Sequence, residues 1–298
     1  MKNKTIKIDD TFAEAFTMKA SRLIVTAHTE KWAIEAAKSF TGFATSVIAC
    51  GCESGIEGYL SRKETPDGRP GVSILIFSMS SKELAKQILN RSGQCIMTTP
   101  STSLFSGNAS KVKIKLGNAL RYFGDGFQIS KVVGGRRFWR IPVMDGEFLC
   151  EEYAYETQAI GGGNFLILGN NIENVLNAAE TAVNAMRKLK NIILPFPGGI
   201  VRSGSKVGSK YKSLIASTNF EYCPTLKGLV KNNLESCVNC VLEIVIDGLT
   251  FDDIELAIRT GINSILKLGK ESGITGISAG NYGGKLGPYL FKLKSIVK

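Results

Sequence analysis

The chain has 298 residues, 44% of them hydrophobic, so it can bury one large core or two cores of ordinary size. No apolar run approaches the roughly 20 residues that span a bilayer. Met1 leads towards acidic Asp9 and Asp10 rather than into an apolar signal segment, so a cytoplasmic protein without a membrane span is expected. The formal charge of +11 permits an anionic partner, but basic residues are spread along the whole chain, and nucleic acid is not expected to bind.

Hydrophobic periodicity in the first half predicts two helices among four strands. Gly42 stops the first helix. Ser80 and Glu83 form a capping box at the start of the second helix, and Gly93 follows its last turn. The predicted order is strand 23–26, helix 32–40, strand 45–50, strand 72–77, a helix between Ser80 and Gly93, and strand 94–98.

The second half repeats this order. Asn170, with Glu173 three residues later, can cap one helix, and Thr250, with Asp253, can cap another. The predicted order is strand 164–168, a helix reaching Met186, a strand near 192–194 or 200–201, strand 240–246, a helix ended by Gly269, and strand 273–278. A hairpin in residues 138–151, turning at Asp145-Gly146, bridges the two halves.

Each half therefore has the strand–helix–strand–strand–helix–strand order of ferredoxin-like folds, in which two helices cover one face of an antiparallel sheet. We predict an α+β protein with an internal duplication and two ferredoxin-like lobes, residues 1–148 and 149–298. Superimposing Ser80 on Thr250 brings Ser73 to the place of Glu243. A carboxylate is thus expected at this position in the C-terminal lobe only.

Glu243 lies in the predicted strand 240–246, where all its neighbours are apolar and favour β structure. An ionised carboxylate in such surroundings is costly. Either the side chain is buried and protonated, with a raised pKa, or it faces a cleft that a substrate completes. Both options make Glu243 the best candidate for acid–base chemistry. The alternative is a structural carboxyl that is hydrogen-bonded to the backbone.

Other chemistries find little support. His28 is the single histidine, and its surroundings suggest a solvated helix start rather than a nucleophile's base. Seven cysteines are scattered along the chain, so free thiols are expected, and the lone pair Cys237 and Cys240 does not make a zinc site. No phosphate-binding or dinucleotide-binding glycine motif has the required spacing. No metal site is predicted.

Several long strings occur in a fixed order along nearly the entire chain. They are Glu64-Thr-Pro-Asp-Gly-Arg-Pro-Gly71, Gly161-Gly-Gly-Asn-Phe165, Phe196-Pro-Gly-Gly-Ile-Val201 and Ser278-Ala-Gly-Asn-Tyr-Gly-Gly-Lys-Leu-Gly287, with shorter strings at 10–16, 205–210, 217–219 and 222–225. With these strings the chain resembles the formylmethanofuran:tetrahydromethanopterin N-formyltransferases. The resemblance implies two ferredoxin-like lobes and a homotetramer built as a dimer of dimers.

The resemblance also implies an activity. Such acyltransferases move a formyl group between methanofuran and N5 of tetrahydromethanopterin in one-carbon metabolism, in methanogenesis or formaldehyde oxidation, and bind no cofactor or metal. The family's catalytic glutamate lies in the strand that matches 240–246, so this role carries over to Glu243. A carboxylic acid with a raised pKa can protonate the oxygen of a tetrahedral intermediate or the leaving amine.

Polar residues inside the matching strings are candidates for orienting the substrates, whose tails carry anionic groups. They are Ser205, Lys206, Ser209, Asn219, Asn281 and Lys285. The alternative for each is a tight turn or a solvated loop. A second function is a subunit of a formyltransferase/hydrolase complex with a mainly structural or hydrolysis-coupled role, although the presence of Glu243 argues against an inactive copy. A ferredoxin-like RNA-binding module would need exposed aromatic residues on its central strands, and the sequence does not provide them.

Overall fold

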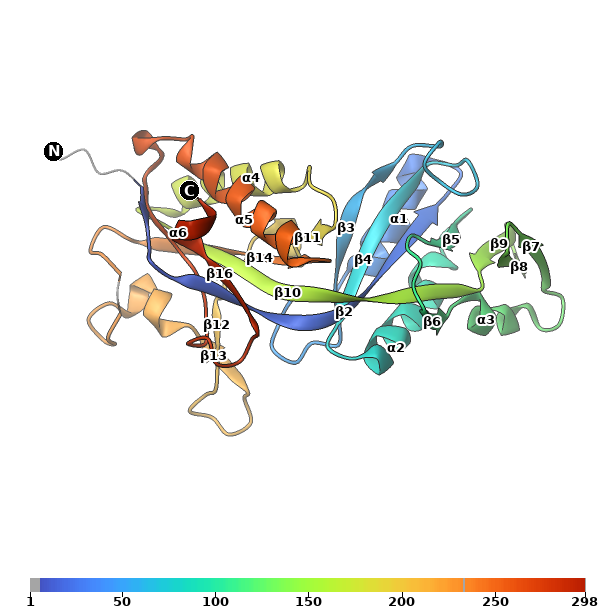
Figure 1. The fold of residues 1–298 in the computed structure, drawn as a ribbon, viewed down its shortest axis with the longest axis horizontal. Helices are drawn as coiled ribbons and strands as arrows, with labels where there is room; N and C mark the ends of the chain where they lie inside the picture. Colours follow the sequence, from blue (N-terminus) through green and yellow to red (C-terminus); the bar gives the residue numbers. More distant parts are fainter. Residues whose placement is uncertain (1–5, 233, 298) are drawn as a thin grey trace. The chain divides into compact units, whose positions relative to one another are not determined.

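A computed structural model describes residues 6–232 and 234–297, and the chain has a mixed α/β fold with a large sheet. It divides into two compact units (Figure 1): unit 1 comprises Met1–Thr17, Ser46–Ala49 and Ile160–Lys298, and unit 2 comprises Met18–Thr45 and Cys50–Ala159. The predicted lobe boundary between residues 148 and 149 stays a prediction. None of the helices in the described part of the chain has the length and apolar character needed to cross a bilayer.

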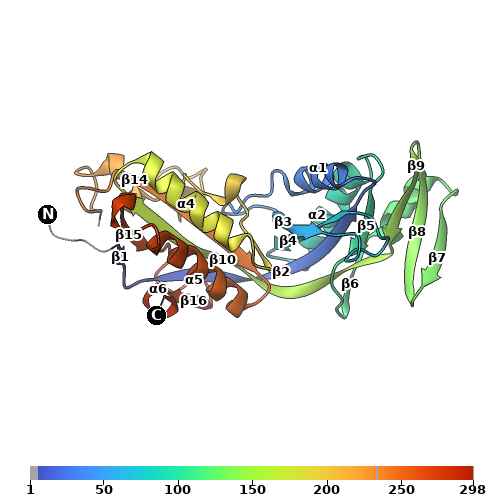
Figure 2. The same ribbon diagram turned by 90° about the horizontal axis from the view of Figure 1, so that it is seen from above.

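Unit 1 is built on a sheet whose strand order is β15, β10, β14, β11, with antiparallel neighbours. Its elements are β1 (Lys7–Ile8), the C-terminal part of β10 (Tyr153–Gly169), α4 (Ile172–Met186), β11 (Ile192–Ile193), β12 (Ser205–Val207), β13 (Ala216–Thr218), β14 (Cys240–Gly248), α5 (Phe251–Leu266), β15 (Ile274–Ser278), β16 (Tyr289–Lys292) and α6 (Leu293–Ile296). Helices α4 and α5 lie side by side along one face of this sheet (Figures 1 and 2). The β12–β13 hairpin lies on the other side of β10 (Figure 1).

Caps and periodicity account for these two helices. The Thr250 side chain accepts a hydrogen bond from the backbone N–H of Asp253, as predicted. The cap of α4 is Asn171, which accepts from the N–H of Asn174, so the predicted cap at Asn170 is wrong by one residue. Helix α5 ends at Leu266, before the predicted stop at Gly269.

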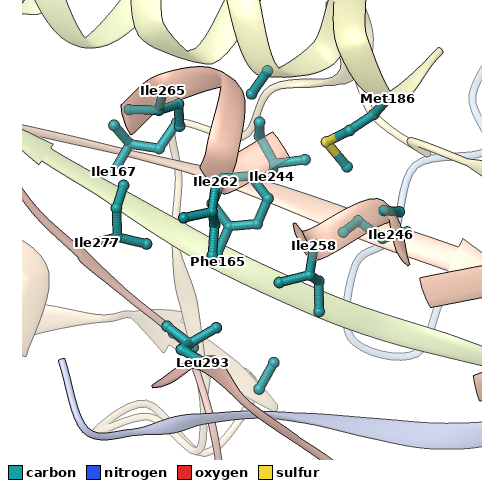
Figure 3. Packing of buried hydrophobic residues seen from close by; sticks show 14 of the residues in the cluster. Phe165, Ile167, Met186, Ile244, Ile246, Ile258, Ile262, Ile265, Ile277 and Leu293 are labelled. Atoms are coloured by element: carbon teal, nitrogen blue, oxygen red, sulfur yellow. The ribbon is translucent and has the colours of Figure 1, made fainter. Parts of the chain in front are cut away.

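The core of unit 1 fills the space between these helices and the sheet (Figure 3). Phe165 and Ile167 of β10 and Ile244 and Ile246 of β14 point into it and are fully buried. Burying each such side chain stabilises the fold by roughly 1.5–3 kcal/mol. Because side chains alternate along a strand, the residues between them must point to the face that carries no helix. We call this the open face of unit 1.

Unit 2 contains a second sheet region with the strand order β5, β2, β4, β3, again with antiparallel neighbours. Its elements are the C-terminal part of β2 (Phe12–Thr26), α1 (Glu30–Thr41), β3 (Glu53–Leu60), β4 (Gly71–Ser78), α2 (Ser81–Arg91), β5 (Ser103–Ser106), β6 (Val112–Lys115), α3 (Gly117–Leu120), β7 (Ile129–Val133), β8 (Arg136–Val143) and β9 (Gly146–Glu151). Strands β8 and β9 form the predicted hairpin around Asp145-Gly146.

Two strands predicted in the first half are wrong. Residues 45–50 are irregular, because Ser46 donates its N–H to the carbonyl of Pro195 and Ala49 has a φ of 67°, which is incompatible with a strand. Residues 94–98 continue the preceding helix through a π-helical turn, Ser92–Ile96, and the Thr98 hydroxyl donates to the carbonyl of Gln94. The strands that pair with β4 and β2 in place of the two predicted strands are β3 and β5, respectively.

Candidate active site

Glu243 lies in the middle of β14, and backbone pairing on both sides of the strand fixes its position. Its N–H donates to the carbonyl of Val201 at 3.0 Å, and its carbonyl accepts from the N–H of Val201 at 2.8 Å. On the other side its partner is Leu166 of β10, which in turn pairs with Ser278 of β15. These three residues therefore form one row across the open face, because directly paired residues share a face.

The carboxyl group of Glu243 is held in apolar surroundings. The residue is partly buried, and burial raises the pKa of its carboxyl from an ordinary value of 4.5 to about 7. In the described part of the chain, no residue makes a hydrogen bond or ion pair with this carboxyl. A structural carboxyl bound to the backbone therefore gains no support here, and a group that titrates near neutrality suits acid–base catalysis.

Asn164 belongs to the same face, two residues from Leu166 along β10. Its side chain accepts a hydrogen bond from the N–H of Gly280 at 2.7 Å and donates to the carbonyl of Gly280 at 3.1 Å. This pair of bonds attaches the segment after β15 to the sheet beside the row that contains Glu243. Sequence reasoning did not single out Asn164, although it lies within the string 161–165.

Tyr282 follows in the segment that Asn164 attaches. Burial raises the pKa of its hydroxyl, and the negative charge of Glu243 raises this pKa further, followed by that of Glu14. Tyr282 thus lies within electrostatic reach of Glu243. Its ring also contacts Phe16, with 5.9 Å between ring centroids. The sequence offered only one signal for Tyr282, its position inside the long string 278–287.

Another tyrosine covers the neighbouring part of the open face. The hydroxyls of Tyr222 and Ser278 are 3.0 Å apart and hydrogen-bonded, and burial raises the pKa of Tyr222. Tyr222 packs with Val238 against Leu166 and Leu168. This apolar cover limits water on one side of the row and helps to explain why the Glu243 carboxyl is desolvated.

Four of the six predicted binding residues lie in or beside the β12–β13 hairpin, whose flanking segments are attached at the open face through Val201 and Tyr222. Ser205 is exposed, and the Lys206 ammonium lies 4.9 Å from the centroid of the Phe220 ring. Ser209 accepts a hydrogen bond from the N–H of Tyr211. Asn219 donates its N–H to the carbonyl of Gly204.

The other two residues, Asn281 and Lys285, are exposed and lie in the segment that carries Tyr282. The Asn281 side chain donates to the Thr11 hydroxyl and to the carbonyl of Phe12. The backbone amides at 282, 284, 286 and 287 bind the carboxylate of Glu14. These four amides are therefore occupied within the chain and do not face a substrate.

Other potential catalytic groups are distributed elsewhere. His28 lies in unit 2, where its backbone N–H donates to the Ser101 hydroxyl. All seven cysteines are free thiols. Within residues 6–232 and 234–297, no group of three or more His, Cys, Asp or Glu side chains is arranged to hold a metal ion.

The fold and the site together present one desolvated carboxyl and two partly buried tyrosines on one face of a sheet, an arrangement that suits an enzyme using acid–base chemistry. Family comparison agrees with this description. Residues 1–143 match the model of formylmethanofuran-tetrahydromethanopterin formyltransferase, and residues 146–296 match the model of the proximal lobe of that enzyme. The chain belongs to the formylmethanofuran-tetrahydromethanopterin formyltransferase family.

Individual relatives are similar over their whole length. The chain is 60% identical to the formylmethanofuran–tetrahydromethanopterin formyltransferase of Methylococcus capsulatus, with 98% of each chain covered. A crystal structure of the formyltransferase/hydrolase complex of Methylorubrum extorquens with methylofuran contains a chain that is 50% identical, with a TM-score of 0.95, covering 100% of this chain and 99% of that one. The formylmethanofuran:tetrahydromethanopterin formyltransferase of Methanosarcina barkeri is 44% identical, with a TM-score of 0.92 and 98% of each chain covered.

Proposed function

We propose that this chain is an acyltransferase that moves a formyl group between formylmethanofuran and N5 of tetrahydromethanopterin. The observation that carries the proposal is the partly buried carboxyl of Glu243, with a pKa of about 7, on the open face of a chain that belongs to this enzyme family. Methanofuran and tetrahydromethanopterin are substrates here, and the chemistry needs no bound cofactor.

Glu243 acts as the acid. The N5 amine attacks the formyl carbon, a C–N bond forms, and the carbonyl oxygen gains negative charge in a tetrahedral intermediate. The protonated carboxyl stabilises this oxygen by donating a hydrogen bond, and it transfers its proton to the methanofuran nitrogen as the old C–N bond breaks. The carboxylate then takes up the proton that N5 has lost, so protons balance over one turnover.

The six polar candidates orient the substrates around this acid. Lys206 and Lys285 supply positive charge for the anionic groups of the substrate tails, and Ser205, Ser209, Asn219 and Asn281 supply hydrogen bonds. Their positions support these roles. On one side of the β12–β13 hairpin, Val201 pairs with Glu243, and on the other side Tyr222 is hydrogen-bonded to Ser278 in the same row. Asn281 and Lys285 flank Tyr282.

Each unit is proposed to contain a ferredoxin-like subdomain. Supporting this, the order β10, α4, β11, β14, α5, β15 in unit 1 matches the order β2, α1, β3, β4, α2, β5 in unit 2, and in both the first strand pairs with the third and fourth. An internal duplication accounts for this correspondence.

The quaternary structure and location are also proposals. We infer a homotetramer built as a dimer of dimers, in which the exposed apolar residues of each chain are covered. The Methylorubrum extorquens relative was crystallised within a formyltransferase/hydrolase complex, which supports similar partners for this chain. The free thiols support a cytoplasmic location, because reducing compartments maintain them.

The decisive test is formyl transfer by the purified chain. Formylmethanofuran and tetrahydromethanopterin are mixed with the wild-type chain or with Glu243→Gln, and N5-formyl product is followed by absorbance and chromatography. We expect stoichiometric transfer by the wild-type chain alone. Formate release without the pterin, or transfer only after hydrolase subunits are added, would instead favour the complex-subunit function.

A further inference from the structure

We propose that Glu14 is a positioning residue for the active site: its buried carboxylate holds residues 280–287, which we call the amide loop, so that Tyr282 stays beside Glu243. The inference rests on the proposed function for its catalytic consequence. The role of Glu14 in holding the loop rests on the contacts of Glu14 alone.

Glu14 is only 1% exposed and lies in β2, on the face opposite to Ala13 and Ala15, which face the core of unit 1. One carboxylate oxygen accepts hydrogen bonds from the N–H groups of Tyr282 and Gly284, at 2.7 and 2.8 Å. The other accepts from the N–H groups at 286 and 287, both at 2.6 Å. Burial alone would raise the pKa of this carboxyl, but the four backbone donors outweigh burial and lower it, so the group stays ionised.

The negative charge of Glu14 is compensated by backbone amides. Among the described residues, no Lys, Arg or His forms an ion pair with Glu14. The amide loop is therefore the group that makes burial of the charge tolerable, and the loop and the carboxylate stabilise each other. A chain that needed only a packed strand at this point would be served by an apolar residue without this cost.

The backbone of the amide loop is shaped for this carboxylate. Gly283 and Gly284 have φ angles of 75° and 71°, in the left-handed region that glycine adopts readily. Successive N–H groups in such a conformation converge on one anion. At Gly287 a Cβ atom would lie 2.3 Å from the carbonyl oxygen of Ala15, so only glycine allows this close approach to β2.

The held loop reaches the reacting centre through two residues. Asn164, on the face of Glu243, binds the start of the loop at Gly280. Glu14 binds the N–H of Tyr282, whose ring contacts Phe16 and whose hydroxyl senses the charges of both Glu243 and Glu14. The loop is thus fixed at both ends, and releasing it at Glu14 lets Tyr282 move and admits water to the Glu243 carboxyl.

The test compares Glu14→Gln with Glu151→Gln in the full chain. The glutamine side chain keeps the shape of the glutamate but has one acceptor oxygen in place of two. Its NH2 group then faces two of the loop N–H groups, which lose their acceptor. Glu151 is a matched control, since it is 2% exposed, accepts a hydrogen bond from the N–H of Ser106 and pairs with Arg136 in unit 2.

Three readouts are expected to change in Glu14→Gln and not in Glu151→Gln. Hydrogen exchange of the loop amides at 282, 284, 286 and 287 accelerates by about 10²-fold. The infrared carboxyl band of Glu243, identified by its loss in Glu243→Gln, titrates at lower pH, towards 4.5. The kcat falls by roughly 10-fold or more, with a smaller change in KM, because the acid and not the substrate affinity is affected.

Unchanged loop exchange, or an unchanged Glu243 titration with lower thermal stability alone, would reduce Glu14 to a structural residue. If Glu14→Gln does not fold, Glu14→Asp serves as the second variant. It keeps the charge but is too short to hold all four amides, so we expect intermediate changes in loop exchange and in the Glu243 titration. Wild-type values of both for Glu14→Asp would overturn the proposal. Exchange and infrared titration need no substrate. A chain that fails to transfer formyl groups but shows both shifts would therefore refute the proposed function and not the role of Glu14 in holding the loop.

Discussion

Replacement of Glu243 by glutamine gives a prediction that separates desolvation from catalysis. The variant retains the shape of the side chain and removes its titration. In the wild-type chain the carboxyl has a pKa of about 7, against an ordinary value of 4.5, so the folded state binds this proton more tightly than the unfolded state does.

The sign of the pH dependence follows from these two values. Below pH 4.5 the carboxyl is protonated in both states and contributes no difference. Between pH 4.5 and about 7 the unfolded chain loses the proton while the folded chain keeps it, so the contribution of Glu243 to the free energy of unfolding falls. Above pH 7 the cost is complete, and since one pKa unit corresponds to about 1.4 kcal/mol, it amounts to about 3 kcal/mol.

The assay is urea unfolding of both proteins from pH 4 to pH 8.5, followed by probes in each unit. We expect the two stabilities to agree near pH 4 and to diverge by up to about 3 kcal/mol at pH 8, with Glu243→Gln the more stable protein. In parallel, kcat falls by roughly 10²–10⁴-fold, and the limb near pH 7 disappears from its pH profile. Parallel stability curves across this pH range would refute the claim that the carboxyl is desolvated, whatever the activity shows.

Three further predictions concern the rest of the molecule. Ser73 in unit 2 is at the position that corresponds to Glu243. Ser73→Ala removes one hydrogen bond to Glu57 and should cost about 1 kcal/mol of stability, while kcat stays within a factor of two. A 10²-fold loss of kcat would contradict the assignment of chemistry to one unit. Chelators should leave activity intact, and elemental analysis that finds one zinc per chain with thiol ligands would overturn that expectation. Light scattering should give a mass above that of one chain, and a fully active species of 32.2 kDa would count against the tetramer.

Local signals in the sequence were sufficient for much of the fold. Ser80 and Thr250 cap their helices as predicted, because a cap depends on residues within one turn. The predicted strand 45–50 failed for the opposite reason. Its apolar residues favour β structure, but the carbonyl of Pro195, far along the chain, binds Ser46 and takes the segment out of the sheet.

The same distinction applies to the candidate site. The desolvation of Glu243 was predictable because its apolar neighbours lie next to it in the sequence, and its catalytic role stays a prediction. Glu14 has the same local signature, a carboxylate between Ala13 and Ala15 within a strand, but its meaning depends on amides 268 to 273 residues away. The contact of Tyr282 with Phe16 is equally non-local, and pattern reasoning along the chain has no access to it.

Comparison of the two units bears on the proposal that the chemistry is confined to unit 1. In unit 2, Ser73 occupies the position that corresponds to Glu243 and donates a hydrogen bond of 2.6 Å to Glu57 on the neighbouring strand β3. The carboxylate of Glu57 also binds the guanidinium of Arg22 through two bonds of 2.6 and 2.7 Å, so its charge is compensated. In unit 1 the Glu243 carboxyl belongs to β14 itself, and none of the described residues forms an ion pair with it, so burial raises its pKa to about 7. Similar arrangements of strands and helices thus hold a charge-compensated carboxylate in unit 2 and, in unit 1, a carboxyl with a pKa of about 7, as the proposed acid requires.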